Sequence, residues 1–213
     1  YEITTRLVGS EMCIRDSFSG IPVLETGLKH GTVTLLIDHE PYEVTTFRVD
    51  GDYTDGRHPD SVAFTTDIRD DLARRDLTIN AMAYSPATGI IDPFGGQEDL
   101  KQGVIRCVGE ARERFTEDAL RMMRAVRFSA QLGYDIEEAT RLAICELSQT
   151  LEKISAERIR TELLKLLVSP HPEMLRICRE TGMTAVFLPE FDQMTQTVQN
   201  NPHHCYDVAE HTI

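Results

Sequence analysis

The pattern of hydrophobic and polar positions divides the chain into a strand-rich first part and a helical remainder. Residues 32–37 and 42–48 are rich in β-branched and aromatic side chains, and residues 38–41 between them form a turn sequence. These features predict two strands joined as a hairpin. Residues 50–60 contain two glycines, four aspartates and a proline. That composition predicts an exposed loop.

Helical spacing of apolar residues dominates the chain after this loop. The sequence predicts helices over 71–84, 136–151 and 155–168. The strongest helix begins at residues 115–118, where Thr116 is a candidate cap, and ends at Gly133. Its apolar face is formed by Ala119, Met123, Val126 and Ala130. The fold class predicted from these elements is α+β, with a small α/β part followed by an all-helical part.

Composition excludes several classes of protein. Lys and Arg number 22 against 35 Asp and Glu, which gives a formal net charge of −13. A protein that envelops nucleic acid with a basic surface is therefore not expected. The sequence contains no apolar run of about 18 residues, the length that would span a membrane. Five scattered cysteines without a C-x-x-C pair are typical of reduced thiols, and we expect a cytoplasmic protein without a membrane partner.

The first chemical signal is the run RRDLTINA, residues 74–81. Adjacent arginines beside Asp76 and Asn80 provide the charged donors and the acceptor that a triphosphate and a ribose hydroxyl require. An ion-paired helix end has the same composition, and spacing alone favours that simpler interpretation.

The second signal is a polar ridge on the strongest helix. Its members recur every three residues: Asp118, Arg121, Arg124 and Arg127. A carboxylate beside a guanidinium presents an acceptor next to a donor, which matches cytosine and adenine and mismatches uracil and guanine. An ordinary ion pair three residues apart is the alternative, and such pairs are common on exposed helices.

Three other segments carry weaker signals. Residues 92–100 contain a paired-glycine turn, which could let the backbone approach a ligand or could be a connector. The C-terminal end holds potential metal ligands that do not make a complete set: His203, His204, Asp207 and His211. Residues 7–17 show neither the helical nor the strand spacing of apolar residues and resemble a translated adapter sequence, so we assign no chemistry to them.

Taken together, the motifs resemble the bacterial tRNA nucleotidyltransferase and poly(A) polymerase family, the class II CCA-adding enzymes. The ordered motifs lie at residues 29–34, 43–48, 53–59, 74–83 and 117–128, within a similarity that covers residues 18–213. The resemblance implies a partial polymerase-β-like head with a small sheet, followed by an all-α neck and body. The implied boundaries are 1–86 for the head, 87–135 for the neck, 136–199 for the body and 200–213 for the start of an HD domain.

The resemblance also implies roles for single residues. Arg75 falls on an arginine that contacts the incoming nucleotide, with Asp76 and Asn80 on the sugar side. Asp118 and Arg121 fall on the pair that serves as a protein template for C and A. Four further segments or residues would support the site: Arg124 and Arg127 by neutralising phosphate or bracing the template, residues 92–100 as a flexible segment, and residues 155–158 as a brace.

Catalysis in this family uses two Mg²⁺ ions held by an Asp-x-Asp/Glu pair. Glu2 resembles the second carboxylate, which would be both catalytic and metal-binding, and the first would precede Tyr1. Asp50 and Asp52 have the same spacing, but we expect them at the surface of a loop. The chain alone is therefore expected to bind nucleotide poorly and not to catalyse.

The implied function is transfer of CMP and AMP, from the substrates CTP and ATP, to the 3′ end of tRNA without a nucleic-acid template. A bacterial poly(A) polymerase, or an enzyme that adds only C or only A, shares these motifs and stays open as an alternative. A non-catalytic RNA-binding relative is the alternative from another class.

Overall fold

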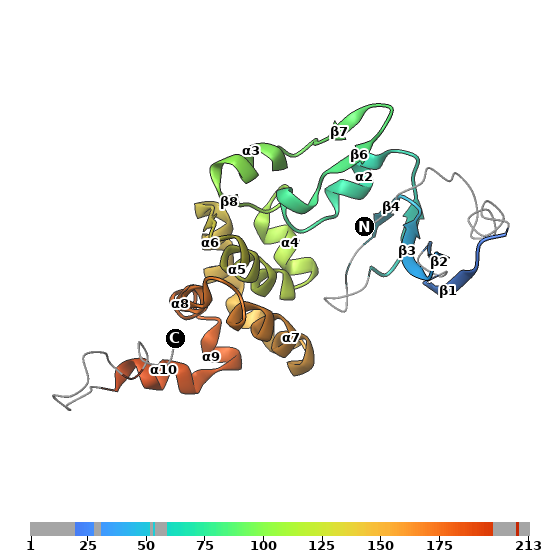
Figure 1. Ribbon diagram of the computed structural model, residues 1–213. Coiled ribbons are helices and arrows are strands. Elements are labelled where there is room, and N and C mark those ends of the chain that lie inside the picture. Colours follow the sequence, from blue (N-terminus) through green and yellow to red (C-terminus); the bar gives the residue numbers. More distant parts are fainter. Residues whose placement is uncertain (1–19, 28–30, 52, 54–58, 198–207, 209–213) are drawn as a thin grey trace. The chain divides into compact units, whose positions relative to one another are not determined.

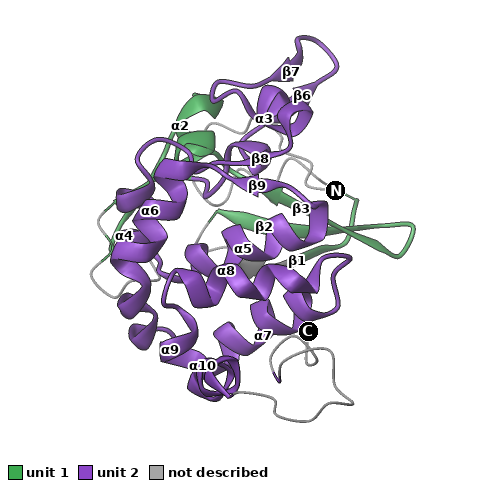
Figure 2. Ribbon diagram, turned by 90° about the vertical axis from the view of Figure 1, so that its left-hand side faces the viewer, with its two compact units in different colours: residues 1–74 green, residues 75–213 purple. Residues whose placement is uncertain are grey.

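The computed structural model describes residues 20–27, 31–51, 53, 59–197 and 208 (Figure 1). The chain forms two compact units, residues 1–74 and 75–213 (Figure 2). Glu2, the histidines after residue 200 and residues 7–17 lie outside the described residues. The boundaries at 86, 135 and 199 stay a prediction.

The first unit contains the predicted hairpin within a three-stranded antiparallel sheet. The strands β1 (Val23–Gly27), β2 (Thr32–Ile37) and β3 (Glu40–Thr45) lie in the order β1-β2-β3. The turn has two residues, Asp38 and His39, both with positive φ, which suits the twist of a tight hairpin. Inward-facing side chains of β2 and β3 form a small core of Val33, Leu35 and Val44.

The rest of the first unit is a second pair of strands and one helix. Strands β4 (Arg48–Asp50) and β5 (Val62–Phe64) pair antiparallel, and helix α2 (Ile68–Ala73) follows. The carboxylate of Asp67 caps α2 by accepting a hydrogen bond from the Arg69 N–H at 2.9 Å. The predicted strand 42–48 is thus divided between β3 and β4.

The second unit is mostly helical. Its described strands are β6 (Ala83–Ser85), β7 (Gly89–Ile91), β8 (Val104–Ile105) and β9 (Asp135–Ile136). Its described α-helices are α3 (Gly96–Gln102), α4 (Ala111–Glu117), α5 (Leu120–Leu132), α6 (Glu138–Leu147), α7 (Ala156–Leu167), α8 (Leu175–Glu180), α9 (Thr184–Phe187) and α10 (Pro189–Gln196). Short 3₁₀-helices are η2 (Thr78–Asn80), η3 (Ser148–Lys153) and η4 (Pro172–Met174). Strands β6 and β7 form a hairpin, and β8 pairs with β9 in parallel. The helices predicted over 136–151 and 155–168 are confirmed as α6 and α7.

The prediction of one helix over residues 71–84 is wrong. Helix α2 ends at Ala73, and the chain then becomes extended at Leu77. The Thr78 N–H donates to the Arg106 carbonyl at 3.0 Å, and the Val108 N–H donates to the Asp76 carbonyl at 3.0 Å. Backbone groups that a helix would pair locally are therefore paired with a distant segment.

Helix α5 is central to the core of the second unit, where it packs against α4, α7 and α8. Its predicted apolar face is confirmed, because all four of its residues are buried: Ala119, Met123, Val126 and Ala130. The end at Gly133 is confirmed as well, with φ of 69°. The predicted start is wrong, since Thr116 lies inside α4 and its hydroxyl donates to the Arg112 carbonyl at 2.8 Å.

The three described cysteines differ in burial. Cys107 and Cys178 are buried, whereas Cys145 is exposed, and all three are free thiols. Burial raises the pKa of the Cys107 thiol to about 12, and that of Cys178 to about 12. Within the described ranges, no helix has the length and apolar character needed to cross a bilayer.

Candidate nucleotide-binding site

The predicted sugar-side residues lie on a short segment, residues 75–80, that is anchored in the second unit. The side chain of Leu77 is fully buried and its backbone bridges to Cys107. This bridge consists of the backbone bonds of Asp76 and Thr78 described above, and it fixes the segment against residues 106–108. Arg75 begins this segment and is half-buried.

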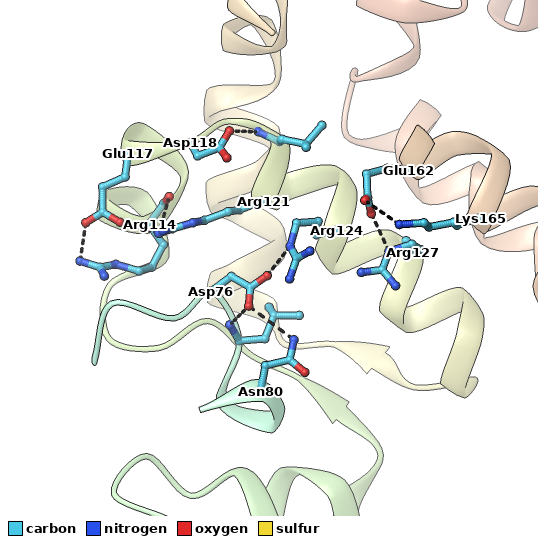
Figure 3. A network of polar contacts seen from close by, with 12 residues as sticks. Asp76, Asn80, Arg114, Glu117, Asp118, Arg121, Arg124, Arg127, Glu162 and Lys165 are labelled. Atoms are coloured by element: carbon cyan, nitrogen blue, oxygen red, sulfur yellow. Dashed lines mark hydrogen bonds and ion pairs between the residues drawn. The ribbon is translucent and has the colours of Figure 1, made fainter. Parts of the chain in front are cut away.

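Asp76 is the centre of a polar network (Figure 3). Its Oδ2 accepts a hydrogen bond from Arg124 Nε at 2.6 Å, and its Oδ1 accepts from the Leu77 N–H at 2.9 Å and from Asn80 Nδ2 at 3.4 Å. Burial alone would raise the pKa of Asp76, but the charge of Arg124 and these hydrogen bonds outweigh it and lower the pKa. Asp76 is therefore an ionised, oriented acceptor at neutral pH.

A break between α4 and α5 positions the predicted template residues. Asp118 is extended, with φ of −149° and ψ of 106°, so it is the only residue between the end of α4 and the Ala119 that caps α5. Its Oδ1 accepts from the Leu120 N–H at 3.0 Å, and its Oδ2 accepts from Arg158 Nη2 at 2.7 Å. Arg158 lies in the first turn of α7, so the brace expected from residues 155–158 makes its contact on Asp118.

Arg121 is held from the other side of the break. Its Nη1 forms an ion pair with Glu117 Oε2 and donates to the Arg114 carbonyl at 3.3 Å. Glu117 Oε1 also pairs with Arg114 Nη2 at 2.6 Å. Neither Arg114 nor Glu117 was predicted to belong to the site. The spacing of three residues between them and of four between Glu117 and Arg121 is a sequence signal that indicates such contacts on a helix.

Arg127 differs from the other members of the predicted ridge because its side chain is buried. Its Nε pairs with Glu162 Oε2 on α7 at 2.5 Å, and its Nη1 donates to Gln131 Oε1 at 2.6 Å. Its guanidinium also lies over the Phe128 ring, 3.8 Å from the centroid. These contacts join α5 to α7, and the two roles that the resemblance implied for Arg127 stay predictions.

Residues 92–100 form a turn followed by the start of helix α3. The flexibility that the resemblance implied for this segment stays a prediction. The carboxylate of Asp92 accepts from the N–H groups of Gly96 and Gln97, each at 2.8 Å, and so caps α3. The following Asp99 accepts from the Thr78 hydroxyl at 2.6 Å, which ties α3 to the segment that carries Asp76. This pattern of bonds gives the segment a structural role.

The metal-binding prediction on Glu2 falls outside the described residues. Over the ranges that the structure describes, no group of three or more His, Cys, Asp or Glu side chains is placed to hold a metal ion. The expectation that Asp50 lies at the surface is wrong, because its side chain is buried and contacts Arg48 Nε at 3.0 Å and the Tyr53 hydroxyl at 2.8 Å. Asp52 also lies outside the described residues.

Two family models match most of the chain. The model of the poly A polymerase head domain matches residues 8–106, and the model of the probable RNA and SrmB-binding site of polymerase A matches residues 133–195. Among curated relatives, the CCA-adding enzyme of Leuconostoc mesenteroides is 54% identical over 68% of this chain and 36% of its own length. That of Lactobacillus helveticus is 52% identical over 84% of this chain and 45% of its own length. The chain thus spans less than half the length of these relatives.

Solved structures agree with these relatives. The Bacillus stearothermophilus CCA-adding enzyme in complex with CTP is 40% identical, with a TM-score of 0.79 over 90% of this chain and 46% of its own. The Thermotoga maritima CCA-adding enzyme complexed with tRNA is 27% identical, with a TM-score of 0.63 over 90% of this chain and 42% of its own. The predicted α+β fold with a small sheet and a helical part is confirmed. The chain belongs to the class II CCA-adding enzyme family of tRNA nucleotidyltransferases.

Proposed function

We propose that the chain is part of an enzyme that transfers CMP and AMP from CTP and ATP to the 3′ end of tRNA without a nucleic-acid template. The curated relatives at about half identity are CCA-adding enzymes, which supports this activity over others of the family. The proposed partners are the tRNA 3′ end and the two nucleotides, and the proposed location is the cytoplasm.

One observation carries the proposal: an acceptor and a donor stand at the start of α5, each anchored from a different side. Asp118 is held by Arg158, and Arg121 is held by Glu117. The Arg121 N–H donates to the Asp118 carbonyl at 3.0 Å, so the two residues are adjacent on the first turn. An anchored acceptor beside an anchored donor discriminates against the reversed order that uracil and guanine present.

The neighbouring network would hold the rest of the nucleotide. Asp76 is ionised and buried, so it suits a ribose hydroxyl as a fixed acceptor, with Asn80 beside it. Arg124 and Arg75 would supply positive charge toward the phosphates. Arg127 would act by holding α5 to α7, because its guanidinium is already bound to Glu162.

The reaction class implies Mg²⁺, which would activate the primer hydroxyl and bind the triphosphate. The described residues do not by themselves fit such a site, because no suitable carboxylate cluster occurs among them. Glu2 is the metal ligand and catalytic carboxylate that we propose, on the resemblance alone.

The test is nucleotide incorporation by the complete enzyme whose gene contains this sequence, with tRNA that lacks its CCA end. We expect incorporation of C and A and exclusion of U and G. Asp118→Ala should abolish that choice, whereas Glu113→Gln, an exposed carboxylate on α4, should leave it unchanged. Unchanged choice in Asp118→Ala would contradict the template role.

The match of residues 8–106 to the poly A polymerase head domain supports a second candidate activity, the addition of AMP alone. Long tails of AMP alone would identify such an enzyme, and incorporation of a single kind of nucleotide would identify a C-adding or A-adding one. No incorporation, together with retained tRNA binding, would identify a non-catalytic RNA-binding relative.

A further inference from the structure

One carboxylate joins two guanidinium groups at the break between α4 and α5 (Figure 3). Glu117 Oε1 pairs with Arg114 Nη2 at 2.6 Å, and Glu117 Oε2 pairs with Arg121 Nη1. The same Nη1 also donates to the backbone carbonyl of Arg114 at 3.3 Å. Arg114 therefore contacts Arg121 through its backbone and holds the carboxylate that pairs with Arg121.

This cluster is shielded from water more than a second ion pair that starts from α4. The side chains of Arg114, Glu117 and Arg121 are between 13% and 21% exposed. The Arg112–Glu146 pair, which also starts from α4, is 68% and 46% exposed. Because water screens a charge pair less as it becomes buried, the Arg114 cluster restrains its members more strongly than the Arg112 pair does.

The break in the helix makes this restraint necessary. Asp118 has an extended backbone, so a continuous helix does not transmit the position of α4 to α5. Arg121 has a long side chain with several rotatable bonds, and a guanidinium donates only within the plane of its N–H groups. A contact that fixes one edge of the guanidinium therefore fixes the direction in which its other donors point.

We propose that Arg114 is a positioning residue that sets base selectivity: it holds Glu117 so that the guanidinium of Arg121 keeps one orientation toward the base. This inference rests on the proposed function, since it requires Arg121 to read the incoming nucleotide. Without Arg114, Glu117 has one guanidinium partner fewer, and the pair it forms with Arg121 can turn as a unit. The donor then loses its alignment with cytosine N3 or adenine N1, and selection against uracil and guanine weakens.

The experiment compares Arg114→Met and Arg114→Lys with the matched control Arg112→Met in the complete enzyme. Steady-state kinetics with each of the four nucleotides give kcat and KM separately, and circular dichroism checks folding. In Arg114→Met we expect selectivity for C and A over U and G to fall about tenfold, mainly through KM for CTP and ATP, because one oriented hydrogen bond is lost. Arg114→Lys should recover part of the selectivity, and Arg112→Met should match wild type.

A second variant covers the case in which Arg114→Met does not fold. Glu117→Gln keeps the size of the side chain but removes the charge that joins the two guanidiniums, and it should show the same loss of selectivity. A wild type that selects C and A, together with Arg114→Met that selects as Arg112→Met does, refutes the positioning role alone. A wild type that incorporates no nucleotide refutes the proposed function itself.

Discussion

Replacing Arg124 with methionine tests the ion pair that joins residues 75–80 to α5. The change removes the charge and the 2.6 Å hydrogen bond to Asp76 while it keeps a long apolar stem. Asp76 is 7% exposed, so its carboxylate would remain buried with its charge partner lost. Breaking a fully buried pair in this way costs about 3–5 kcal/mol.

The magnitude expected here is smaller, because the side chain of Arg124 is 35% exposed and water screens part of the interaction. Asp76 also keeps its bonds from Leu77 and Asn80. We therefore expect Arg124→Met to lower the free energy of unfolding by about 2 kcal/mol. Urea unfolding followed by far-UV circular dichroism measures it, since most helices lie in residues 75–213.

A double-mutant cycle with Asp76→Asn separates the pair from other effects. We expect a coupling free energy of about 1–2 kcal/mol between Asp76 and Arg124 at neutral pH. The pKa of Asp76 is lowered in the folded state from its ordinary value of 3.8, so the pair stabilises the fold above that pH. This contribution is lost as the pH falls through the lowered pKa. A coupling below about 0.5 kcal/mol, or one that does not fall in acid, would refute the reasoning.

Three further predictions concern packing and burial. Gly96→Ala would place a Cβ 2.3 Å from the Thr78 carbonyl oxygen, so it should lower the free energy of unfolding by about 2–3 kcal/mol in the same urea assay. An unchanged midpoint of urea unfolding would contradict this. Cys107 should resist iodoacetamide while exposed Cys145 reacts, since burial raises the pKa of the Cys107 thiol to about 12, and equal labelling by peptide mass spectrometry would be the contrary result. Arg127→Met leaves the buried carboxylate of Glu162 without its Arg127 partner and should lower the free energy of unfolding by about 3–5 kcal/mol. A loss under about 1 kcal/mol would show that the pair contributes little to stability.

The candidate site was predictable as a set of residues but not as a set of contacts. Asp76 and Arg124 were both named from their motifs, yet 48 positions separate them, and only the folded chain brings them within 2.6 Å. Arg127 shares the three-residue spacing of Asp118 and Arg121. Spacing on one helix could not show that α7 covers Arg127, because that depends on how a second helix packs.

The sequence alone determined the elements whose residues interact mainly with their neighbours along the chain. β-branched residues predicted strand β2, Gly133 predicted the end of α5, and apolar spacing predicted α7, because each depends on the local residue pattern or on one backbone angle. The motif order in the chain was sufficient to indicate the family, since motifs are linear by nature.

Tertiary structure decided where local preferences were overridden. Residues 71–84 and 115–120 have helical composition, yet the chain is extended at Leu77 and Asp118. At Leu77 the backbone pairs with residues 106–108, and at Asp118 the carboxylate binds Arg158 from α7. Such partners lie tens of positions away, so hydrogen bonds and ion pairs that form only on folding outweigh intrinsic helix propensities of a few tenths of a kcal/mol per residue.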